Sequence, residues 1–429
     1  MTRTGEAALV VFASLLAAAG TALVILAADE GVAVDVAAAG GAHLAAFGGL
    51  LLAVRRWAGA GSRLLVAPIA LITALGSIEV FRIDPDLGRL QRWWLLLAAA
   101  LAAGLLHLMR NRGVEPLRRF RYLALSAALA LLAAPLLPGS WPVGGATING
   151  SRLWVRLDLG DRSLSFQPGE AAKILLVVFL ASYLADRWQG LAAMPRSLGP
   201  LRLPEPRQLL PVVLAFGVSF VVLVYQRDIG ASLLLFVVFV VMLFVATGRP
   251  SYLLAGGVLA AGGAVAAANA FAHVATRVTA WLRPFDDFTG AGFQAAQGIF
   301  ALAEAGMLGS GLGSGAPYLI PAAATDYVFV AITEETGLAG GLGMLAAYAL
   351  MVAAGFGIAL RAADRFRSLL AAGLTITLAV QILLIVGGVL RLLPLTGIAL
   401  PFASYGGSSL LANMVIVALL CRISHEERS

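Results

Sequence analysis

The residues best suited to chemistry lie between Arg277 and Gly337, in a polar, glycine-rich stretch set between long apolar runs. This stretch carries adjacent carboxylates at Asp286 and Asp287, followed by Gly290-Ala-Gly-Phe-Gln294. A positioned carboxylate can take a proton from a substrate or bind a divalent cation, and glycine lets the backbone approach a ligand closely. A connection this long in a compact protein is typically functional or disordered. Two interpretations are open from the residues alone: an acidic pair that carries the chemistry, or a solvated turn in a surface loop.

A second polar cluster places Arg152 ahead of Glu170 and Lys173, at the start of an apolar run. Residues three apart share a face of a helix, and an acid nearer the N-terminus suits both the ion pair and the helix dipole. Lys173 is the only lysine in the chain. Two interpretations remain open: a structural ion pair, or an ammonium group that contacts a phosphate of a lipid substrate.

Two more clusters lie at the ends of apolar runs. Asp228 belongs to Gln226-Arg-Asp-Ile-Gly230, which is either a polar turn or part of the lining of a shared cavity. The segment from Leu400 to Ser409 combines proline, glycine and hydroxyl side chains at the depth of a membrane span. Such a segment predicts broken helices packed inside the protein or around a cavity, with Ser404, Tyr405 and Ser408 supplying hydrogen bonds.

Composition and hydropathy predict an all-α, polytopic membrane helical bundle. The 429 residues are 60% hydrophobic and 12% charged, and they contain one cysteine, so no internal disulfide can form. Apolar runs of about 20 residues match the thickness of a bilayer and favour helices. Twelve spans are expected near 8–27, 36–54, 64–81, 93–109, 122–138, 168–186, 209–225, 229–247, 251–272, 328–360, 368–390 and 404–421.

The distribution of arginine predicts the orientation of these spans. If the N-terminus is cytoplasmic, 19 of the 30 basic residues fall in cytoplasmic segments, as the positive-inside rule expects. The C-terminus is then cytoplasmic too, and the loops 139–167 and 273–326 are extracytoplasmic. The net charge of +7 reflects this topology, and no nucleic-acid partner is expected, because no basic patch is interleaved with aromatic residues.

Five motifs, taken in order, resemble the SEDS family of shape, elongation, division and sporulation proteins. They are Arg152-Leu-Trp154 with Gln167-Pro-Gly-Glu170-x-x-Lys173; Gln226-Arg-Asp228-Ile-Gly230; Pro284-x-x-Asp287 with Gly292-Phe-Gln294; Thr325-Asp326-Tyr-Val-Phe329 with Glu334-Glu335-x-Gly337; and Leu400-Pro-Phe-Ala-Ser404-Tyr405-Gly-Gly-Ser408-Ser409. The likeness runs from about Arg82 to Ile423, and the last motif is highly specific.

The resemblance implies a peptidoglycan glycosyltransferase in the bacterial cytoplasmic membrane. Such enzymes polymerise lipid II, a disaccharide-pentapeptide on undecaprenyl pyrophosphate, into β-1,4 glycan outside the membrane. The implied partners are lipid II, the lipid-linked glycan, membrane lipids and a class B penicillin-binding protein, and a divalent cation (Mg or Mn) is expected to assist. The family core has ten spans, so residues 1–62 are expected to form an additional hairpin without a catalytic part, ahead of a core at 63–429. The short C-terminal tail favours a role in cell elongation over division.

The resemblance also assigns site residues. Asp287 falls on the essential aspartate of the family and is expected to act as the base, with a metal ion as a possible second role. Phe288 replaces a common proline, so Asp286 is a rival for the base. The substrate-binding or structural polar residues are Glu170, Lys173, Arg152, Asp228, Gln294, Asp326, Ser404, Tyr405 and Ser408. Other departures are Gly169 for serine, Ile385 for asparagine and Arg391 for glycine.

Two other functions fit the same residues. A lipid II flippase would also place polar groups in broken spans. A non-catalytic scaffold would only recruit and activate a transpeptidase. A polymerase differs from both because it should lose glycan synthesis when Asp287 becomes alanine.

Overall fold

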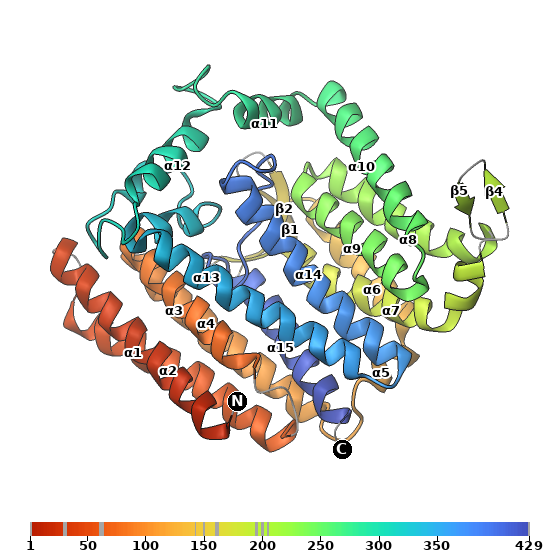
Figure 1. The fold of residues 1–429 in the computed structure, drawn as a ribbon, viewed down its shortest axis with the longest axis horizontal. Helices are drawn as coiled ribbons and strands as arrows, with labels where there is room; N and C mark the ends of the chain where they lie inside the picture. The colour runs from red at the N-terminus through yellow and green to blue at the C-terminus, as the bar shows by residue number, and fades with distance from the viewer. Residues whose placement is uncertain are drawn as a thin grey trace. The chain divides into compact units, whose positions relative to one another are not determined.

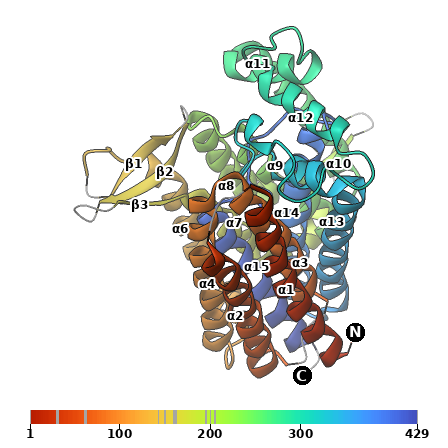
Figure 2. The same ribbon diagram turned by 90° about the vertical axis from the view of Figure 1, so that its left-hand side faces the viewer.

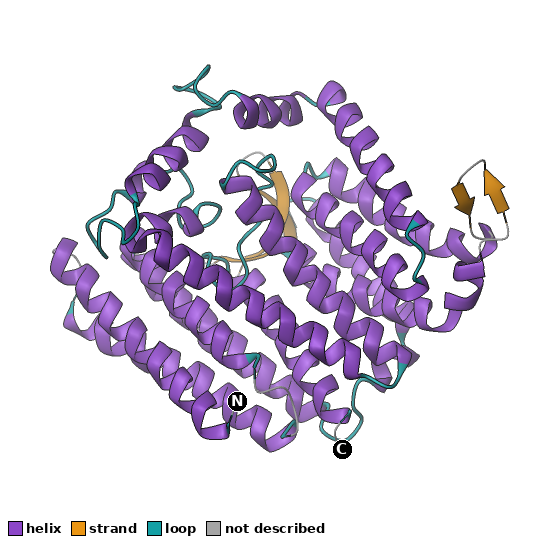
Figure 3. Cartoon of the chain, viewed as in Figure 1, coloured by secondary structure: helices purple, strands orange, loops and turns teal. Residues whose placement is uncertain are grey.

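The computed structural model describes residues 2–28, 32–59, 64–141, 143–148, 151–158, 163–193, 196–198, 201–203 and 206–427. Helices dominate these residues, with five short strands beside them (Figure 1, Figure 3). This architecture confirms the predicted all-α membrane bundle.

The helices are α1 (Arg3–Ala28), α2 (Ala33–Trp57), α3 (Val66–Ile83), α4 (Pro85–Leu108), α5 (Glu115–Arg119), α6 (Arg121–Ala133), η1 (Ala134–Leu136), α7 (Pro168–Ala193), α8 (Pro206–Tyr225), α9 (Ile229–Thr247), α10 (Ser251–Ala270), α11 (Ala272–Leu282), α12 (Phe293–Glu304), η2 (Pro317–Leu319), α13 (Val328–Arg361), α14 (Arg365–Val389) and α15 (Gly407–Glu426). The strands are β1 (Val143–Ile148), β2 (Ser151–Asp158), β3 (Ser163–Phe166), β4 (Arg196–Leu198) and β5 (Leu201–Leu203).

Eleven described helices are long and apolar enough to cross a membrane. The twelfth expected span, 122–138, corresponds to a shorter apolar stretch, Arg121–Leu136. Its α-helical part stops at Ala133, and Pro135 lies in the 3-10 turn that follows. Proline cannot donate the backbone hydrogen bond that would continue the helix. The prediction of about twelve spans therefore holds, with α6 as the short one.

The sequence provides local signals for where several helices begin and end. Asp84 caps α4 by accepting hydrogen bonds from the backbone N–H groups of Asp86 (2.9 Å) and Leu87 (3.1 Å), and Pro85 occupies the first turn. Asp228 caps α9 in the same way, through the N–H of Ala231 at 2.9 Å. Gly248 ends α9 in the left-handed conformation.

The chain divides into two compact units. The first comprises residues 1–110, 264–354 and 381–429, where α1 and α2 pack against each other and against α3 and α4, and α15 packs on α4. The second comprises residues 111–263 and 355–380, where α7 packs against α6 and α9. Both N-terminal helices thus belong to the same unit as the predicted catalytic segment.

Within the first unit, three helix ends meet. Arg55 of α2 donates to the backbone oxygen of Arg3 (2.6 Å), and Arg422 of α15 donates to that of Trp57 (3.1 Å). The start of α1 and the ends of α2 and α15 therefore lie together. In Figure 2 both termini lie at this end of the unit, and α11 and α12 lie at the other end.

The 273–326 segment, expected to be a long polar loop, is partly helical. It contains most of α11, all of α12 and the η2 turn, joined by turns and glycine-rich loops. Short helices of this kind lack the long apolar run by which the membrane helices were recognised. The chain after this segment enters α13, which is broken at Gly337 (φ 73°, ψ −178°). A residue with a Cβ is strained at this φ, and a Cβ here would also lie 2.4 Å from the amide nitrogen of Gly309.

The 139–167 segment, also expected to be a loop, folds into a three-stranded antiparallel sheet in the order β1-β2-β3. The register pairs Val143 with Leu157 and Val155 with Phe166. Leu153, Val155 and Leu157 alternate with polar or aromatic residues, and this period of two is the signal typical of a strand. The sequence prediction treated the segment as a loop between two membrane spans and did not use this alternation.

Close helix contacts in the first unit should make its stability sensitive to added methyl groups. A Cβ on Gly76 of α3 would lie 2.3 Å from the carbonyl oxygen of Ala403, whereas one on Gly104 of α4 would meet open space. We expect Gly76→Ala to lower the unfolding free energy by about 1–3 kcal/mol through overpacking. Gly104→Ala should be neutral or stabilising by about 0.5–1 kcal/mol, because glycine weakens helices. Thermal unfolding in detergent measures both; equal transition temperatures would contradict the expectation.

Candidate functional site

Asp287 lies in a tight turn between α11 and α12. Its backbone oxygen accepts hydrogen bonds from the N–H groups of Gly290 (3.2 Å) and Gly292 (3.0 Å). Its side-chain Oδ2 accepts one from the N–H of Ala291 (2.8 Å). A Cβ on Gly290 would lie 2.5 Å from each carboxylate oxygen, so the small residue is required for the carboxylate to occupy this place. The turn therefore fixes Asp287 through main-chain groups.

An open groove of about 410 Å³ runs beside this turn. One face of α11 and the turn line it: Ala272, Ala275, Thr276, Thr279, Ala280, Arg283, Asp287, Ala291 and Gly292. Thr276 and Thr279 donate their hydroxyl hydrogens to the carbonyl oxygens four residues earlier, both at 3.0 Å. Their oxygen lone pairs remain available as acceptors. The groove thus offers acceptor oxygens, one carboxylate and one guanidinium.

The two candidate bases differ in their surroundings. Both Asp286 and Asp287 are exposed. Asp286 Oδ2 lies 3.9 Å from Nη1 of Arg283, and Asp286 is not part of the groove lining. Asp287 lines the groove and is anchored to the backbone. The geometry therefore favours Asp287 over Asp286 as the residue that meets a ligand.

Two reciprocal contacts hold α11 in place. Trp281 Nε1 donates to the backbone oxygen of Arg391 (2.8 Å), and Arg391 Nη2 donates to the backbone oxygen of Trp281 (2.7 Å). Arg277 donates to the carbonyl oxygens of Leu395 (3.2 Å) and Thr396 (3.0 Å). Sequence reasoning did not assign Arg277, Trp281 or Arg391 to the site, although Arg391 was noted as a departure from glycine. Its φ is +60°, which is a conformation that glycine favours.

The hydroxyl cluster after Leu400 joins the segment before α15 to the segment before α13. Ser404 Oγ donates to the backbone oxygen of Thr325 and accepts from the N–H of Leu400 (2.8 Å). The backbone N–H of Tyr405 donates to the oxygen of Ala324 (2.8 Å). Ser408 is buried in the first turn of α15. In this structure, Ser404 and the Tyr405 backbone hold two chain segments together.

Gln294 and Asp326 belong to the same unit as the Asp287 turn. Gln294 Nε2 donates to the backbone oxygen of Pro321 (2.7 Å), so it ties the start of α12 to the segment that carries Asp326. Burial raises the pKa of the Asp326 carboxyl, and Thr325 and the Arg277 guanidinium partly oppose that shift. Neither residue lines the Asp287 groove.

The remaining predicted residues lie in the second unit. Glu170 Oε2 and Lys173 Nζ lie 2.7 Å apart on the first turns of α7, with side chains 13% and 5% exposed. Arg152 Nη2 donates to the backbone oxygen of Leu137 (2.5 Å), and Asp228 caps α9. Each of the four therefore makes a contact that stabilises its own unit, and their contact with substrate stays a prediction.

Sequence reasoning named Glu334 and Glu335 within a family motif, but it assigned neither of them, nor Glu79, to a buried carboxylate network. Glu335 of α13 accepts hydrogen bonds from Arg82 Nε (3.3 Å) and from the N–H groups of Gly313 (2.9 Å) and Gly315 (3.2 Å). Glu334 accepts one from the N–H of Ala316 (2.8 Å). Glu79, Glu334 and Glu335 are at most 3% exposed. The signal in the sequence was their position inside or beside apolar spans, where a charge requires a partner.

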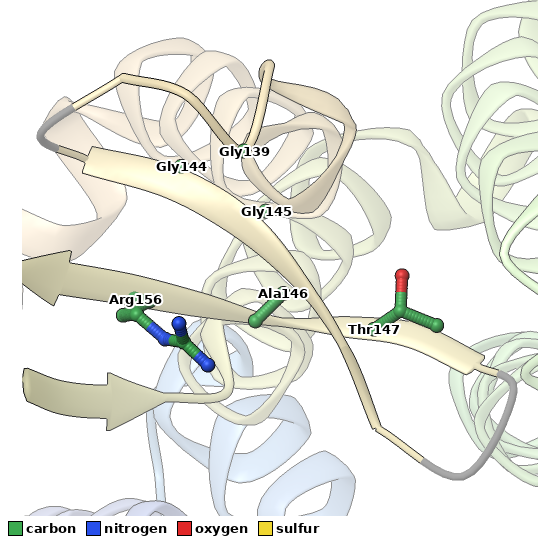
Figure 4. A pocket seen from close by; sticks show the side chains of 6 residues that line it. All are labelled: Gly139, Gly144, Gly145, Ala146, Thr147 and Arg156. Atoms are coloured by element: carbon green, nitrogen blue, oxygen red, sulfur yellow. The ribbon is translucent and has the colours of Figure 1, made fainter.

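A second cavity, of about 220 Å³, lies on the β1–β2 sheet of the second unit (Figure 4). Its lining residues are Gly139, Gly144, Gly145, Ala146, Thr147 and Arg156. It contains no carboxylate, so it cannot supply a base. The groove beside Asp287 is therefore the better candidate for the reaction site.

Carboxylate spacing limits how a metal ion could bind. Among the residues that the structure describes, no group of three or more His, Cys, Asp or Glu side chains could hold one. A Mg²⁺ ion can nevertheless be bound by one or two carboxylates together with the phosphates of a substrate. Asp287 suits that arrangement, because its carboxylate lines the groove.

Comparison with known proteins adds the family. The family described as "Cell cycle protein" (FtsW, RodA, SpoVE) matches residues 64–429. The peptidoglycan glycosyltransferase RodA of Mycobacterium tuberculosis is 39% identical over 99% of this chain and 91% of its own length. The probable peptidoglycan glycosyltransferase FtsW of Geobacter sulfurreducens is 34% identical over 76% and 83%. The stage V sporulation protein E of Bacillus subtilis is 31% identical over 70% and 77%.

Solved structures agree with this result. A chain from a structure described as "Structural coordination of polymerization and crosslinking by a peptidoglycan synthase complex" is 29% identical, with a TM-score of 0.70, over 86% of this chain and 98% of that one. Thermus thermophilus RodA is 28% identical, with a TM-score of 0.57, over 86% and 98%. Sequence motifs, the helical fold and these matches together establish that the chain belongs to the FtsW/RodA/SpoVE family.

Proposed function

We propose that this protein is a peptidoglycan glycosyltransferase of the bacterial cytoplasmic membrane that polymerises lipid II into β-1,4 glycan strands for cell elongation. The relatives that match most of its length are named for this activity. One structural observation carries the proposal: the Asp287 carboxylate, which accepts a hydrogen bond from the main-chain N–H of Ala291, lines an open groove together with hydroxyls and a guanidinium. A groove with this lining suits a saccharide that bears an anionic group.

Asp287 is the general base in this proposal. The acceptor sugar hydroxyl loses its proton to the Asp287 carboxylate as its oxygen attacks the anomeric carbon of the donor. The bond from that carbon to the diphosphate breaks, and the electron pair leaves with undecaprenyl diphosphate. Attack opposite the leaving group inverts the anomeric centre, so an α-linked donor gives a β-linked product.

Arg283 and the two threonines orient the substrate. Thr276 and Thr279 present acceptor oxygens for sugar hydroxyls, because their own hydrogens are used within α11. Arg283 supplies a guanidinium at the groove, and that group binds phosphate through several N–H donors. The negative charge that develops on the leaving diphosphate would be stabilised by this cation.

A divalent cation, Mg or Mn, is proposed to bind with the substrate diphosphate and the Asp287 carboxylate. When bound, it would neutralise charge on the phosphate oxygens. The N–H of Ala291 bonds Oδ2 of Asp287 and not Oδ1. Oδ1 is therefore the oxygen proposed to bind the cation.

The catalytic groove is proposed to face the extracytoplasmic side, with both termini in the cytoplasm. The arginine distribution supports this orientation, and so do the contacts among the ends of α1, α2 and α15.

A class B penicillin-binding protein is the proposed partner, since one similar chain comes from a structure described as a peptidoglycan synthase complex. Lipid II would enter from the bilayer between helices.

Replacing Asp287 with alanine should abolish polymerisation. We expect the rate to fall by about 10²–10⁴-fold, the usual contribution of a positioned base. Asp286→Ala is the matched control and should keep most of the rate. Purified protein with its partner, lipid II and Mg²⁺ would be scored for polymer on a gel, with lipid translocation measured in parallel. Translocation without polymer in the wild type would indicate a flippase, and normal polymer from Asp287→Ala in the complex would indicate a scaffold.

Removing the guanidinium from the groove should weaken use of the lipid-linked donor. We expect Arg283→Ala to lower kcat/KM for lipid II by about 10-fold or more, because a hydrogen bond to a charged group contributes about 1.5–3 kcal/mol. Arg112→Ala, an exposed arginine between α4 and α5, serves as the control. Steady-state polymerisation at several lipid II concentrations measures the effect. Equal kcat/KM for the two variants would exclude the assigned role.

The buried pair on α7 should behave as a unit in unfolding experiments. Lys173→Met leaves the Glu170 carboxylate without its 2.7 Å partner and should lower the unfolding free energy by about 3 kcal/mol or more. Combining it with Glu170→Gln should restore most of that loss, since no isolated charge remains. Thermal unfolding tests this, and a double variant as unstable as Lys173→Met would refute it. The polymerisation rate of the restored protein then distinguishes a structural pair from a phosphate ligand.

A further inference from the structure

The N-terminal helix α1 contacts the glycine-rich loop that precedes α13. A Cβ on Gly313 would lie 2.6 Å from the Cβ of Ala27 and 3.4 Å from the Cα of Val24, so loop and helix touch closely. Leu312 packs on a buried cluster of Val24, Ile78 and Phe81. The helices α1 and α2 lie outside the residues matched by the family, 64–429. An element added to the family fold therefore meets a loop inside it.

Polar side chains attach the hairpin of α1 and α2 to the core helices α3 and α4. His43 of α2 bonds Ser14 of α1 (3.1 Å) and the backbone oxygen of Ala70 in α3 (2.9 Å). Asp35 of α2 pairs with Arg89 (3.0 Å) and Arg92 (2.8 Å) of α4, and its side chain is 6% exposed. A hairpin with buried polar contacts to two core helices is a rigid platform.

The same loop is bound to α13 on its other side. The N–H groups of Gly313 and Gly315 donate to Glu335, and Arg82 Nη2 donates to the carbonyl oxygen of Gly315 (3.1 Å). Backbone bonds from Ser310 to Glu334 and from Gly311 to Glu335, both 3.0 Å, add to this attachment. The loop is therefore held between α1 and the start of α13.

The loop is linked to the Asp287 turn through the side chain of Gln294. After Ala316 the chain forms η2 and reaches Pro321, whose carbonyl oxygen accepts a hydrogen bond from Gln294 (2.7 Å). Gln294 is the second residue of α12, which begins one residue after the turn that holds Asp287 ends at Gly292. A displacement of the loop would thus reach the turn through one side-chain contact.

We propose that α1 is a positioning element for the glycosyltransferase reaction: through Val24 and Ala27 it presses the Leu312–Gly313 loop onto Glu335 and so maintains the placement of the Asp287 turn. The inference rests on the proposed function. It replaces the expectation that the N-terminal hairpin has no part in catalysis. A small misplacement of a catalytic group can cost about 10²-fold in rate. A contact outside the groove can therefore affect turnover if it changes the position of Asp287.

Ala27→Leu tests the contact in the full-length protein, because it adds bulk where loop and helix touch. Ala8→Leu is the matched control, because Ala8 is exposed like Ala27 but lies near the opposite end of the same helix. We expect Ala27→Leu to lower kcat for lipid II polymerisation by about 10-fold or more, with KM little changed. Amide hydrogen exchange of residues 306–326 and 284–294 should rise in Ala27→Leu and stay at the wild-type level in Ala8→Leu.

A second substitution separates positioning from general loss of structure. Leu312→Ala removes the loop side chain that packs against Val24 and should lower kcat and raise exchange in 284–294 as Ala27→Leu does, with the exchange of α15 unchanged. Faster exchange in 306–326 with unchanged kcat would overturn the proposal, as would equal behaviour of Ala27→Leu and Ala8→Leu. If wild-type protein makes no polymer, the proposed function fails; if it does and Ala27→Leu matches it, only the positioning role fails.

Discussion

The main-chain anchoring of one carboxylate is the constraint on which the rest of the site depends. Asp287 is held by N–H groups of its own turn, and the glycines at 290 and 292 leave the space that this turn requires. The turn also needs support from neighbouring elements, and its Phe285 and Phe288 rings pack against Phe300 of α12. The neighbouring helices are held by further contacts. Trp281 of α11 bonds Arg391, and Gln294 of α12 bonds the backbone oxygen of Pro321.

Hydropathy was sufficient to predict the membrane helices. A bilayer requires a long apolar run, and this pattern remains visible even where a few polar residues interrupt it. Every expected span corresponds to a helix, including the short α6. The same signal failed at α11, α12 and the β1–β3 sheet, which are short and contain polar residues or glycine. The alternation in β2 was visible at Leu153, Val155 and Leu157, but glycine-rich flanks concealed it.

The motifs located the acidic turn, but they could not rank its two carboxylates. Asp286 and Asp287 are neighbours in sequence, and only the fold shows that one lines a groove and the other lies near Arg283. Spacing did place Glu170 and Lys173 on one helical face. The network of Glu79, Glu334 and Glu335 depends on contacts between residues about 250 positions apart, for example Arg82 with Glu335. Local patterns do not encode such contacts.

Arg391 has a strained backbone conformation, but its side chain makes a contact that a glycine could not make. An arginine with φ of +60° is strained by about 1 kcal/mol relative to a glycine at the same place. Its guanidinium, however, reaches Trp281, whose indole returns a bond to the Arg391 carbonyl. A glycine at this position would relax the backbone but would remove the guanidinium that bonds Trp281. Without that contact α11 would be held less firmly, and the width of the groove beside Asp287 would vary with the position of the helix.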